Sequence, residues 1–461
     1  MPLNMDFHGC NCKNVTITEG IFGEVWIDNK DQIFNDPLPK MIKSYTMINT
    51  NRMEVVVITW GATIASLKCP DKYGHSVDIV LGFDDMKGYS NPITNPFIGC
   101  ILGRCANRIK DGHITIRSRD YELTKNDFNG KHHLHGGTNG FGRKVWDSYI
   151  AGCSVVMSYL SQDGEEGYPG AVLTTIKFKL TPENKLNICM RATTSKPTIV
   201  NLSHGSMFNL AGHDSGELEL RKHKVLLNCD RWTFADYTDP VPTGAIHGVG
   251  GTAMDFRIPR ILGEYMGKIP PGEGYDHNLC VTKSGQSGSS FVAKVWHVKS
   301  GRALEIYSDQ RGVQFYTGGR LPPYIIPEFL SSYDLLEVNQ YVNCQQHSTY
   351  VNINLYIINL TVLQDIEEAE EIGEVYKTDD KDEEEMKVVK RYKKITVPKK
   401  LEFILGKHGT HYKKYCAFSI QPQNYPNAIH YSHFPCSILY PGQVYYHDLT
   451  YKFEVHLANY M

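Results

Sequence analysis

Apolar and polar residues alternate with a period of two along much of the chain. The clearest runs are MEVVVITW (53–60), AVLTTIKFKL (171–180), KLNICMRA (185–192) and YVNINLYIINL (350–360). Successive side chains of an extended strand point to opposite faces, so each run predicts a half-buried strand with one apolar face. Patterns typical of amphipathic helices are few. The chain is therefore predicted to fold mainly as β-structure.

Turn-forming residues separate these predicted strands. Clusters rich in Gly, Pro and Asp occur in PDKYGH (70–75), SQDGEEGYPG (161–170) and KIPPGEGYD (268–276). These residue types favour tight turns. Many strands joined by short connections are typical of packed antiparallel sheets, so the predicted fold class is an all-β sandwich.

One segment breaks this pattern. From about residue 364 the chain reads QDIEEAEEIGEVYKTDDKDEEEMKVVKRYKKITVPKK, an acidic block followed by a basic block. This composition predicts a disordered surface segment at 364–400, or a short charged helix. The alternative is an arm that binds a protein partner, because blocks of like charge often serve as interaction tails. The two blocks could also pair with each other.

Composition excludes several classes of protein. The 461 residues are 41% hydrophobic and 21% charged, which is typical of globular chains. A formal net charge of -2 creates no global field for nucleic acid or a membrane. No apolar run is long enough for a membrane span, and the N-terminus has no secretory pattern. The twelve cysteines are scattered apart from Cys10 and Cys12, so we expect reduced thiols and a cytoplasmic location.

A series of motifs follows in order between Ile42 and Phe453. They are VVITWGATIASLKCPDKYG, LGFDDMKGY, ILGRCANRI, HHLHGGTNGFGRKVWD, NLSHGSMFNL, PTGAIHGVGGTAMDFR, GYDHNLC, SGRALEIYSDQRGVQFYTGG and AFSIQPQNYPNAIHYSHFPCSILYPGQVYYHDLTYKF. The series resembles that of the aldose 1-epimerase (galactose mutarotase) family, of which this chain looks like a divergent member. It is interrupted between Arg320 and Leu405.

The resemblance implies a galactose mutarotase-like β-supersandwich with an open cleft for a free aldohexose such as galactose or glucose, and no cofactor. We expect an N-terminal extension at 1–40 and a mutarotase-like domain at 41–461. The interruption at about 320–405 is expected to be a charged insertion at the surface.

Mutarotation exchanges the α and β anomers of a sugar through the open-chain aldehyde. One group takes a proton from the anomeric hydroxyl while another gives a proton to the ring oxygen, which is general acid–base catalysis. By resemblance, Asn107 and Arg108 are the family's sugar-binding pair, and His135 is the assisting histidine near the ring oxygen. Asp276 matches the carboxylate that binds sugar hydroxyls, and Gln314 is expected to face the cleft.

Structural roles are open for some of these residues. Arg108 could be a buried arginine that satisfies turn carbonyls, and Gln314 could be satisfied within its sheet. His133 and His135 would share one face of a strand. No cysteine or carboxylate stands at ligand spacing from these two histidines, so no metal site is predicted.

The two central positions of the family's chemistry are altered. Gly205 stands where the resemblance places the acid histidine, and Gln421 stands where it places the catalytic glutamate. Glycine carries no side-chain proton, and a glutamine amide does not titrate near neutral pH. His204 is a possible substitute, although a neighbour on a strand faces the other way unless the strand slips or bulges.

Three functions from different classes remain open. The first is a mutarotase-fold protein that binds a hexose through Arg108, His135, Asp276 and Gln421 with weak or lost activity. The second is an active aldose 1-epimerase with a rearranged acid and base such as His204. The third is an interaction protein that uses the charged insertion.

Overall fold

The computed structural model describes residues 9–12, 14–27, 38–236, 239–269, 274–283, 288–325, 340–342, 372–375, 386–391 and 400–457. The chain divides into two compact units. Unit 1 comprises Met1–Pro323 and Glu402–Met461, and unit 2 comprises Tyr324–Leu401. Antiparallel strands are the predominant regular structure of the described residues and helices are few and short, which confirms the predicted fold class.

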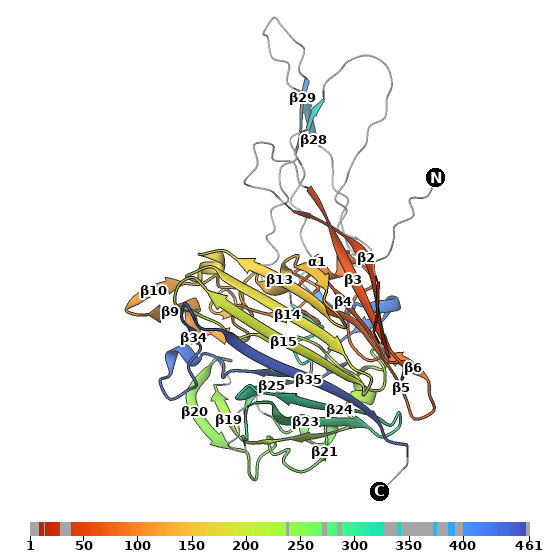
Figure 1. Cartoon of the computed structure of the whole chain (residues 1–461). Helices are drawn as coiled ribbons and strands as arrows, with labels where there is room; N and C mark the ends of the chain where they lie inside the picture. The colour runs from red at the N-terminus through yellow and green to blue at the C-terminus, as the bar shows by residue number, and fades with distance from the viewer. Residues whose placement is uncertain are drawn as a thin grey trace, which may run out of the picture. The chain divides into compact units, whose positions relative to one another are not determined.

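The largest sheet of unit 1 has nine strands. Their order is β12 (Asp147–Ile150), β13 (Val155–Ser161), β14 (Val172–Leu180), β15 (Lys185–Thr194), β35 (Tyr445–Val455), β24 (Arg302–Ser308), β23 (Ser290–His297), β18 (His223–Leu227) and β21 (Arg260–Ile261). Strands β13, β14, β15 and β35 run side by side across this unit (Figure 1). In β14 and β15 burial alternates residue by residue, as the period-two pattern predicts.

A six-stranded sheet contains the N-terminal part of the chain. Its strands follow the order β1 (Gly9–Cys12), β2 (Val15–Ile27), β3 (Leu38–Asn49), β4 (Glu54–Ile58), β5 (Thr63–Pro70) and β6 (Ser76–Asp78). Strand β2 lies within the expected N-terminal extension at 1–40, yet it pairs with β3 along nearly its whole length. Part of that extension therefore belongs to a sheet of unit 1.

A five-stranded sheet carries Asp276, Gln314 and Gln421 of the candidate site. Its order is β20 (Pro242–Gly248), β19 (Cys229–Ala235), β22 (Asp276–Val281), β25 (Gly312–Tyr316) and β33 (Ser419–Gln423). On β25, Val313 and Phe315 belong to the large hydrophobic core, as does Ile420 on β33. Because side chains alternate along a strand, Gln314 and Gln421 lie on the opposite face. One face of this sheet therefore packs on the core while the other presents polar groups.

Short elements complete unit 1. The helices are α1 (Met86–Ser90), α2 (Gly216–Leu220) and α3 (Gly263–Met266). The two-stranded pairs are β7 (Ile101–Leu102) with β17 (Ser203–His204), β8 (Arg108–Ile109) with β11 (His133–Leu134), β9 (His113–Ile116) with β10 (Arg119–Glu122), β16 (Thr198–Ile199) with β34 (Ile438–Leu439), and β31 (Ile404–Leu405) with β32 (His411–Tyr412). Within the described part of the chain, no helix is long and apolar enough to cross a membrane.

Unit 2 contains the expected insertion. Strands β27 (Gln340–Val342), β29 (Met386–Arg391) and β28 (Ile372–Val375) form a three-stranded antiparallel sheet, and β26 (Tyr324–Ile325) pairs with β30 (Lys400–Leu401). Two of these strands fall inside the segment 364–400 that the sequence predicts to be disordered. Most of that segment, and the strand predicted at 350–360, lie outside the described residues.

The cysteines depart from expectation at one position. Eight described cysteines are free, and most of them are buried. Cys153 is disulfide-bonded, so the prediction that every cysteine is a reduced thiol is wrong there. A thiol pair can be joined wherever the chain brings two sulfur atoms together, and scattered spacing along the sequence does not report that approach.

The core also contains neutral histidines. His204, His223 and His447 are fully buried. Burial lowers the pKa of His204 to about 3, that of His223 to about 3 and that of His447 to about 4. Each uses at least one ring nitrogen in a hydrogen bond, His204 with the Ser206 hydroxyl at 3.0 Å. All three rings are therefore uncharged at neutral pH.

These histidines make the fold sensitive to acid. In the folded protein the pKa of His204 lies below the ordinary value of 6.5. The contribution of the neutral His204 ring to the free energy of unfolding is therefore complete above pH 6.5 and is lost as pH falls toward 3. Replacement of His204 by Phe, whose ring suits the neighbouring Phe178 and Tyr451 rings, should reduce the slope of unfolding free energy against pH by about 1.4 kcal/mol per unit. Urea titrations between pH 7 and 4.5 measure this slope. The exposed His75 provides the control as His75→Phe, and an unchanged slope for His204→Phe would contradict the argument.

Candidate functional site

The register of the five-stranded sheet aligns three amide side chains. Asn278 on β22 lies opposite Gln314 on β25, and Gln314 lies opposite Gln421 on β33. Residues directly opposite each other share a face of the sheet. The next row along the same face holds Asp276, Tyr316 and Ser419. The sheet thus brings Asp276, Gln314 and Gln421 together from distant parts of the sequence.

Four charged side chains close into a ring beside this face. Arg108 donates through Nε to Asp127 Oδ2 at 2.6 Å, and its Nη1 lies 3.9 Å from Asp276 Oδ2. Arg320 donates through Nε to the same Asp276 oxygen at 2.9 Å, and its Nη1 lies 3.9 Å from Asp127 Oδ1. Positive and negative charges alternate around this group, which we call the charged ring. Its net charge is zero when all four groups are ionised.

Both carboxylates of the charged ring are ionised at neutral pH. Burial raises the pKa of Asp276, but Arg320 and Arg108 outweigh it and hold that pKa at about 2. Burial likewise opposes ionisation of Asp127, and the two arginines again lower its pKa below the ordinary value. Asp276 can therefore only accept hydrogen bonds.

The hydrogen-bond partners of Arg108 differ from those of an arginine that satisfies turn carbonyls. Its Nε contacts a carboxylate, not a turn carbonyl. The arginine that satisfies turn carbonyls is Arg104, which donates to the backbone oxygens of Pro169 and Gly170. Arg108 is thus held by charges that belong to the site.

Two amide side chains connect the charged ring to the neighbouring loop. Asn107 donates through Nδ2 to Gln314 Oε1 at 2.9 Å, and Gln314 donates through Nε2 to Asp276 Oδ1 at 2.7 Å. Asn107 adopts a φ of 68°, a left-handed conformation that asparagine tolerates better than most residues. These bonds fix the orientation of both amides. Gln314 is therefore satisfied within the network and also lies on the face of the site.

The His135 ring is neutral and holds one tautomer. Its Nδ1 accepts a hydrogen bond from the Asn107 backbone N–H at 3.1 Å, so the proton of the neutral ring lies on Nε2. Burial, with a smaller contribution from the Arg108 charge, lowers the His135 pKa to about 3. No described residue forms a hydrogen bond with Nε2. His135 therefore offers a single N–H donor.

Gly205 is enclosed by backbone atoms. Its N–H donates to the Cys100 carbonyl at 2.8 Å, and its carbonyl accepts from the Gly99 N–H at 2.9 Å. A β-carbon added at Gly205 would lie only 2.6 Å from the Phe97 carbonyl oxygen. The direction that a side chain would take is thus occupied by the main chain. Gln421, by contrast, has an ordered side chain that donates to the Ser419 hydroxyl at 3.0 Å.

His204 points into the core. Its ring lies among the rings of Phe178 and Tyr451, with centroid separations of 6.4 Å to each. Its Nδ1 is paired with the Ser206 hydroxyl. None of its described contacts is with the charged ring. The strand β17 therefore follows ordinary alternation, with no slip that turns His204 toward Asp276.

His133 has both ring nitrogens engaged. Nδ1 lies 2.6 Å from the Thr124 carbonyl, and Nε2 lies 2.5 Å from the Tyr168 hydroxyl. A metal ligand needs one free ring nitrogen. Among the residues that the structure describes, no cluster of three or more His, Cys, Asp or Glu side chains could hold a metal ion.

Three residues of the site carry no clear signal in the sequence. Asp127 lies in the loop before His135, Arg320 stands at the edge of the insertion, and Phe97 contacts the His135 ring at a centroid separation of 5.2 Å. One cue was available, because an arginine expected to be buried requires a carboxylate partner. That cue does not indicate which of the 50 acidic residues supplies it.

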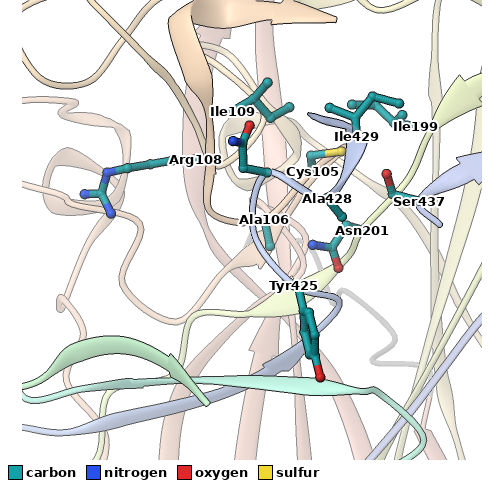
Figure 2. Close-up of a pocket in the computed structure, with 11 residues that line it drawn as sticks. Cys105, Ala106, Arg108, Ile109, Ile199, Asn201, Tyr425, Ala428, Ile429 and Ser437 are labelled. Carbon is teal, nitrogen blue, oxygen red and sulfur yellow. The ribbon is translucent and has the colours of Figure 1, made fainter. Parts of the chain in front are cut away.

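Arg108 is also one of the residues that line a pocket. Its lining includes Cys105, Ile109, Ile199, Asn201 and Ile429. Figure 2 shows the Arg108 guanidinium pointing away from these residues. Arg108 therefore lines this pocket while its guanidinium lies outside the pocket, in the charged ring.

Comparisons with known proteins identify the family of this chain. The family model described as aldose 1-epimerase matches residues 43–353. The chain belongs to the aldose 1-epimerase family. It is 31% identical to galactose mutarotase of Bos taurus over 441 residues, which cover 96% of this chain and 99% of the relative. It is also 31% identical to galactose mutarotase of Homo sapiens, with 88% and 93% covered.

Solved structures of the family show a similar fold. A GalM/aldose epimerase homologue from C. elegans aligns with a TM-score of 0.65 and 26% identity, covering 88% of this chain and 97% of that one. A galactose 1-epimerase from Lactobacillus acidophilus aligns with a TM-score of 0.62 over 95% and 98% of the two chains. Its 18% identity supports the fold alone. The galactose mutarotase-like fold predicted for this family member is therefore confirmed.

The crowding at Gly205 predicts a cost for any side chain there. Gly205→Ala should destabilise the protein by about 1–3 kcal/mol, because the new methyl group meets the Phe97 carbonyl and the main chain must shift. Urea unfolding monitored by fluorescence gives the difference. Gly248→Ala is the matched control, since a β-carbon there meets no atom within 4 Å. Equal stability of the two variants would show that the Phe97 loop yields without cost.

Proposed function

We propose that this aldose 1-epimerase family member binds a free aldohexose at the charged ring and has weak or no mutarotase activity. The observation that carries the proposal is the pair of substitutions at the centre of the site. Gly205 offers no proton and no room for a side chain, and the Gln421 amide cannot act as a base. The surrounding binding groups are present and ordered.

The binding groups suit a neutral polyol. Asp276 accepts hydrogen bonds from sugar hydroxyls, and the Gln314 and Gln421 amides can both donate and accept. His135 donates from Nε2 to the ring oxygen. Charged and planar partners of this kind orient hydroxyl groups well, and the zero net charge of the ring favours an uncharged sugar.

Catalysis lacks its two proton carriers. A well-placed general acid or base contributes about 10²–10⁴-fold in rate. His135 remains neutral far below physiological pH, so it donates a hydrogen bond but does not readily exchange a proton. The protein therefore holds the sugar without speeding the exchange of its anomers.

The ligand and the cellular location of the protein are expectations that follow from its family. Galactose or glucose is the expected ligand, because two relatives at 31% identity are named galactose mutarotase. We expect a cytoplasmic protein of hexose metabolism. A protein partner for the charged insertion is a separate hypothesis.

A polarimetric assay tests the activity directly. Freshly dissolved α-galactose with the purified protein should equilibrate at nearly the rate of a buffer blank, while ligand-observed NMR detects binding with a Kd in the range of about 1 mM. Asp276→Asn should weaken that binding, because a neutral amide accepts weaker hydrogen bonds from the sugar hydroxyls than a carboxylate does. Turnover comparable to an active galactose mutarotase, abolished by His204→Ala, would instead establish an enzyme with a rearranged acid.

Restoring the base alone should not restore the enzyme. Gln421→Glu supplies a carboxylate at the family position, but position 205 still has no acid, and residues that act as a unit are strongly non-additive. We expect less than about a tenfold gain in polarimetric rate, where one independent group would give at least a hundredfold. Gln423→Glu, two residues along β33, is the control for added charge. A gain of a hundredfold or more would mean that His135 suffices as the acid.

A further inference from the structure

Only one arginine of the charged ring is accessible. The Arg108 side chain is 5% exposed, whereas the Arg320 side chain is 47% exposed. The Nε group of Arg108 donates a hydrogen bond to Asp127, and its Nη1 lies near Asp276. A ligand that approaches Asp276 therefore meets the guanidinium of Arg320.

Arg320 keeps donors that the protein does not use. A guanidinium has five N–H groups. The Nε group of Arg320 donates to Asp276 Oδ2, and the 3.9 Å between Nη1 and Asp127 is beyond hydrogen-bond range. Among the described residues no hydrogen bond involves Nη2. Most of the donor capacity of Arg320 is thus free for a ligand.

Asp276 likewise keeps free acceptor capacity. Oδ1 accepts one hydrogen bond from Gln314, and Oδ2 accepts one from Arg320. A carboxylate has about four acceptor positions, so each oxygen retains one. The Asp276 side chain is 29% exposed. A hydroxyl can therefore reach it without displacing either partner.

The position of Arg320 is set by the sheet. Its backbone N–H donates to the Tyr316 hydroxyl at 2.9 Å, and Tyr316 lies directly opposite Asp276 in the register of β25 and β22. This bond ties the chain after β25 to the strand that carries the carboxylate. Arg320 and Asp276 are consequently held as a fixed donor–acceptor pair.

We propose that Arg320 is a sugar-binding residue that works with Asp276 on two neighbouring hydroxyls of the ligand. One hydroxyl donates to the free acceptor position of Asp276, and its neighbour accepts from a terminal N–H of Arg320. The pairing selects sugars with both hydroxyls present. This inference rests on the proposed function, because it assigns a ligand contact within the same site.

The first test compares affinities for galactose by ligand-observed NMR or calorimetry. Arg320→Ala should weaken binding about 10- to 100-fold, as expected for loss of a charge-assisted hydrogen bond. Arg320→Lys should recover only part of the lost affinity, because an ammonium group lacks the planar arrangement of N–H donors of a guanidinium. Arg311→Ala, at the opposite end of β25 and also exposed, should bind as the wild type does.

The second test identifies the contact itself. Galactoses that lack one hydroxyl each are measured against the wild type and Arg320→Ala. Removing the hydroxyl that Arg320 contacts should lower the affinity of the wild type about tenfold or more and leave the affinity of Arg320→Ala almost unchanged. A merely structural role of Arg320 would weaken every ligand by the same factor. Melting temperatures accompany the titrations, and Arg320→Gln replaces the alanine variant if that variant unfolds.

The outcomes separate this inference from the proposed function. If the wild type binds galactose and Arg320→Ala binds it with the same affinity, the inference alone is overturned. The inference is also overturned if removing each hydroxyl of galactose lowers the affinity of the variant by the same factor as that of the wild type. Tighter binding by Arg320→Ala also overturns it, since Arg320 would then be competing with the sugar for Asp276. Absence of any binding by the wild type overturns the proposed function and this inference together.

Discussion

The site depends on a buried positive charge. Arg108 lies on a two-residue strand with its guanidinium almost fully enclosed, and a cation removed from water is costly unless carboxylates and hydrogen bonds compensate. Asp127 supplies the short contact, and Asp276 supplies a longer one. Without either carboxylate, part of the free-energy cost of burying the Arg108 guanidinium would not be offset. The loop with Asp127 and the strand with Asp276 are therefore fixed by the same requirement.

The fixed charges determine the protonation of their neighbours. The positive charge of Arg108 adds to burial in keeping His135 neutral, while the two arginines keep Asp276 ionised. Gln314 and Asn107 contribute amides, which do not change charge with pH. Each described group around the ring thus has one protonation state at neutral pH. Under the proposed function these groups orient a sugar, whereas mutarotation would require groups that change their protonation state during each turnover.

The sequence predicted some of these features and not others, for physical reasons. The strands predicted at 171–180 and 185–192 are confirmed with small changes in their bounds, because alternation is a local property of the sequence. The assignment of Gly205 and Gln421 to the catalytic positions stays a prediction from the family resemblance. The partnership of Arg108 with Asp127 spans a loop, and that of Asp276 with Arg320 spans 44 positions. Contacts of this kind are created by the sheet register, which no short pattern encodes. The Cys153 disulfide was also missed, because spacing along the sequence does not report which sulfur atoms approach each other.

Gly205 stands where two segments of the backbone approach each other closely. Glycine is the residue that permits close approach of two backbones, and here it lets the Phe97 carbonyl come within 2.6 Å of the position of a β-carbon. Phe97 itself has a φ of 63°, and its ring rests against His135 and the Arg143 guanidinium. A histidine introduced at 205 would have to displace this loop, and with it a neighbour of His135. The present packing therefore opposes a histidine at position 205, while the hydrogen-bonding groups of Asp276, Gln314 and His135 are in place.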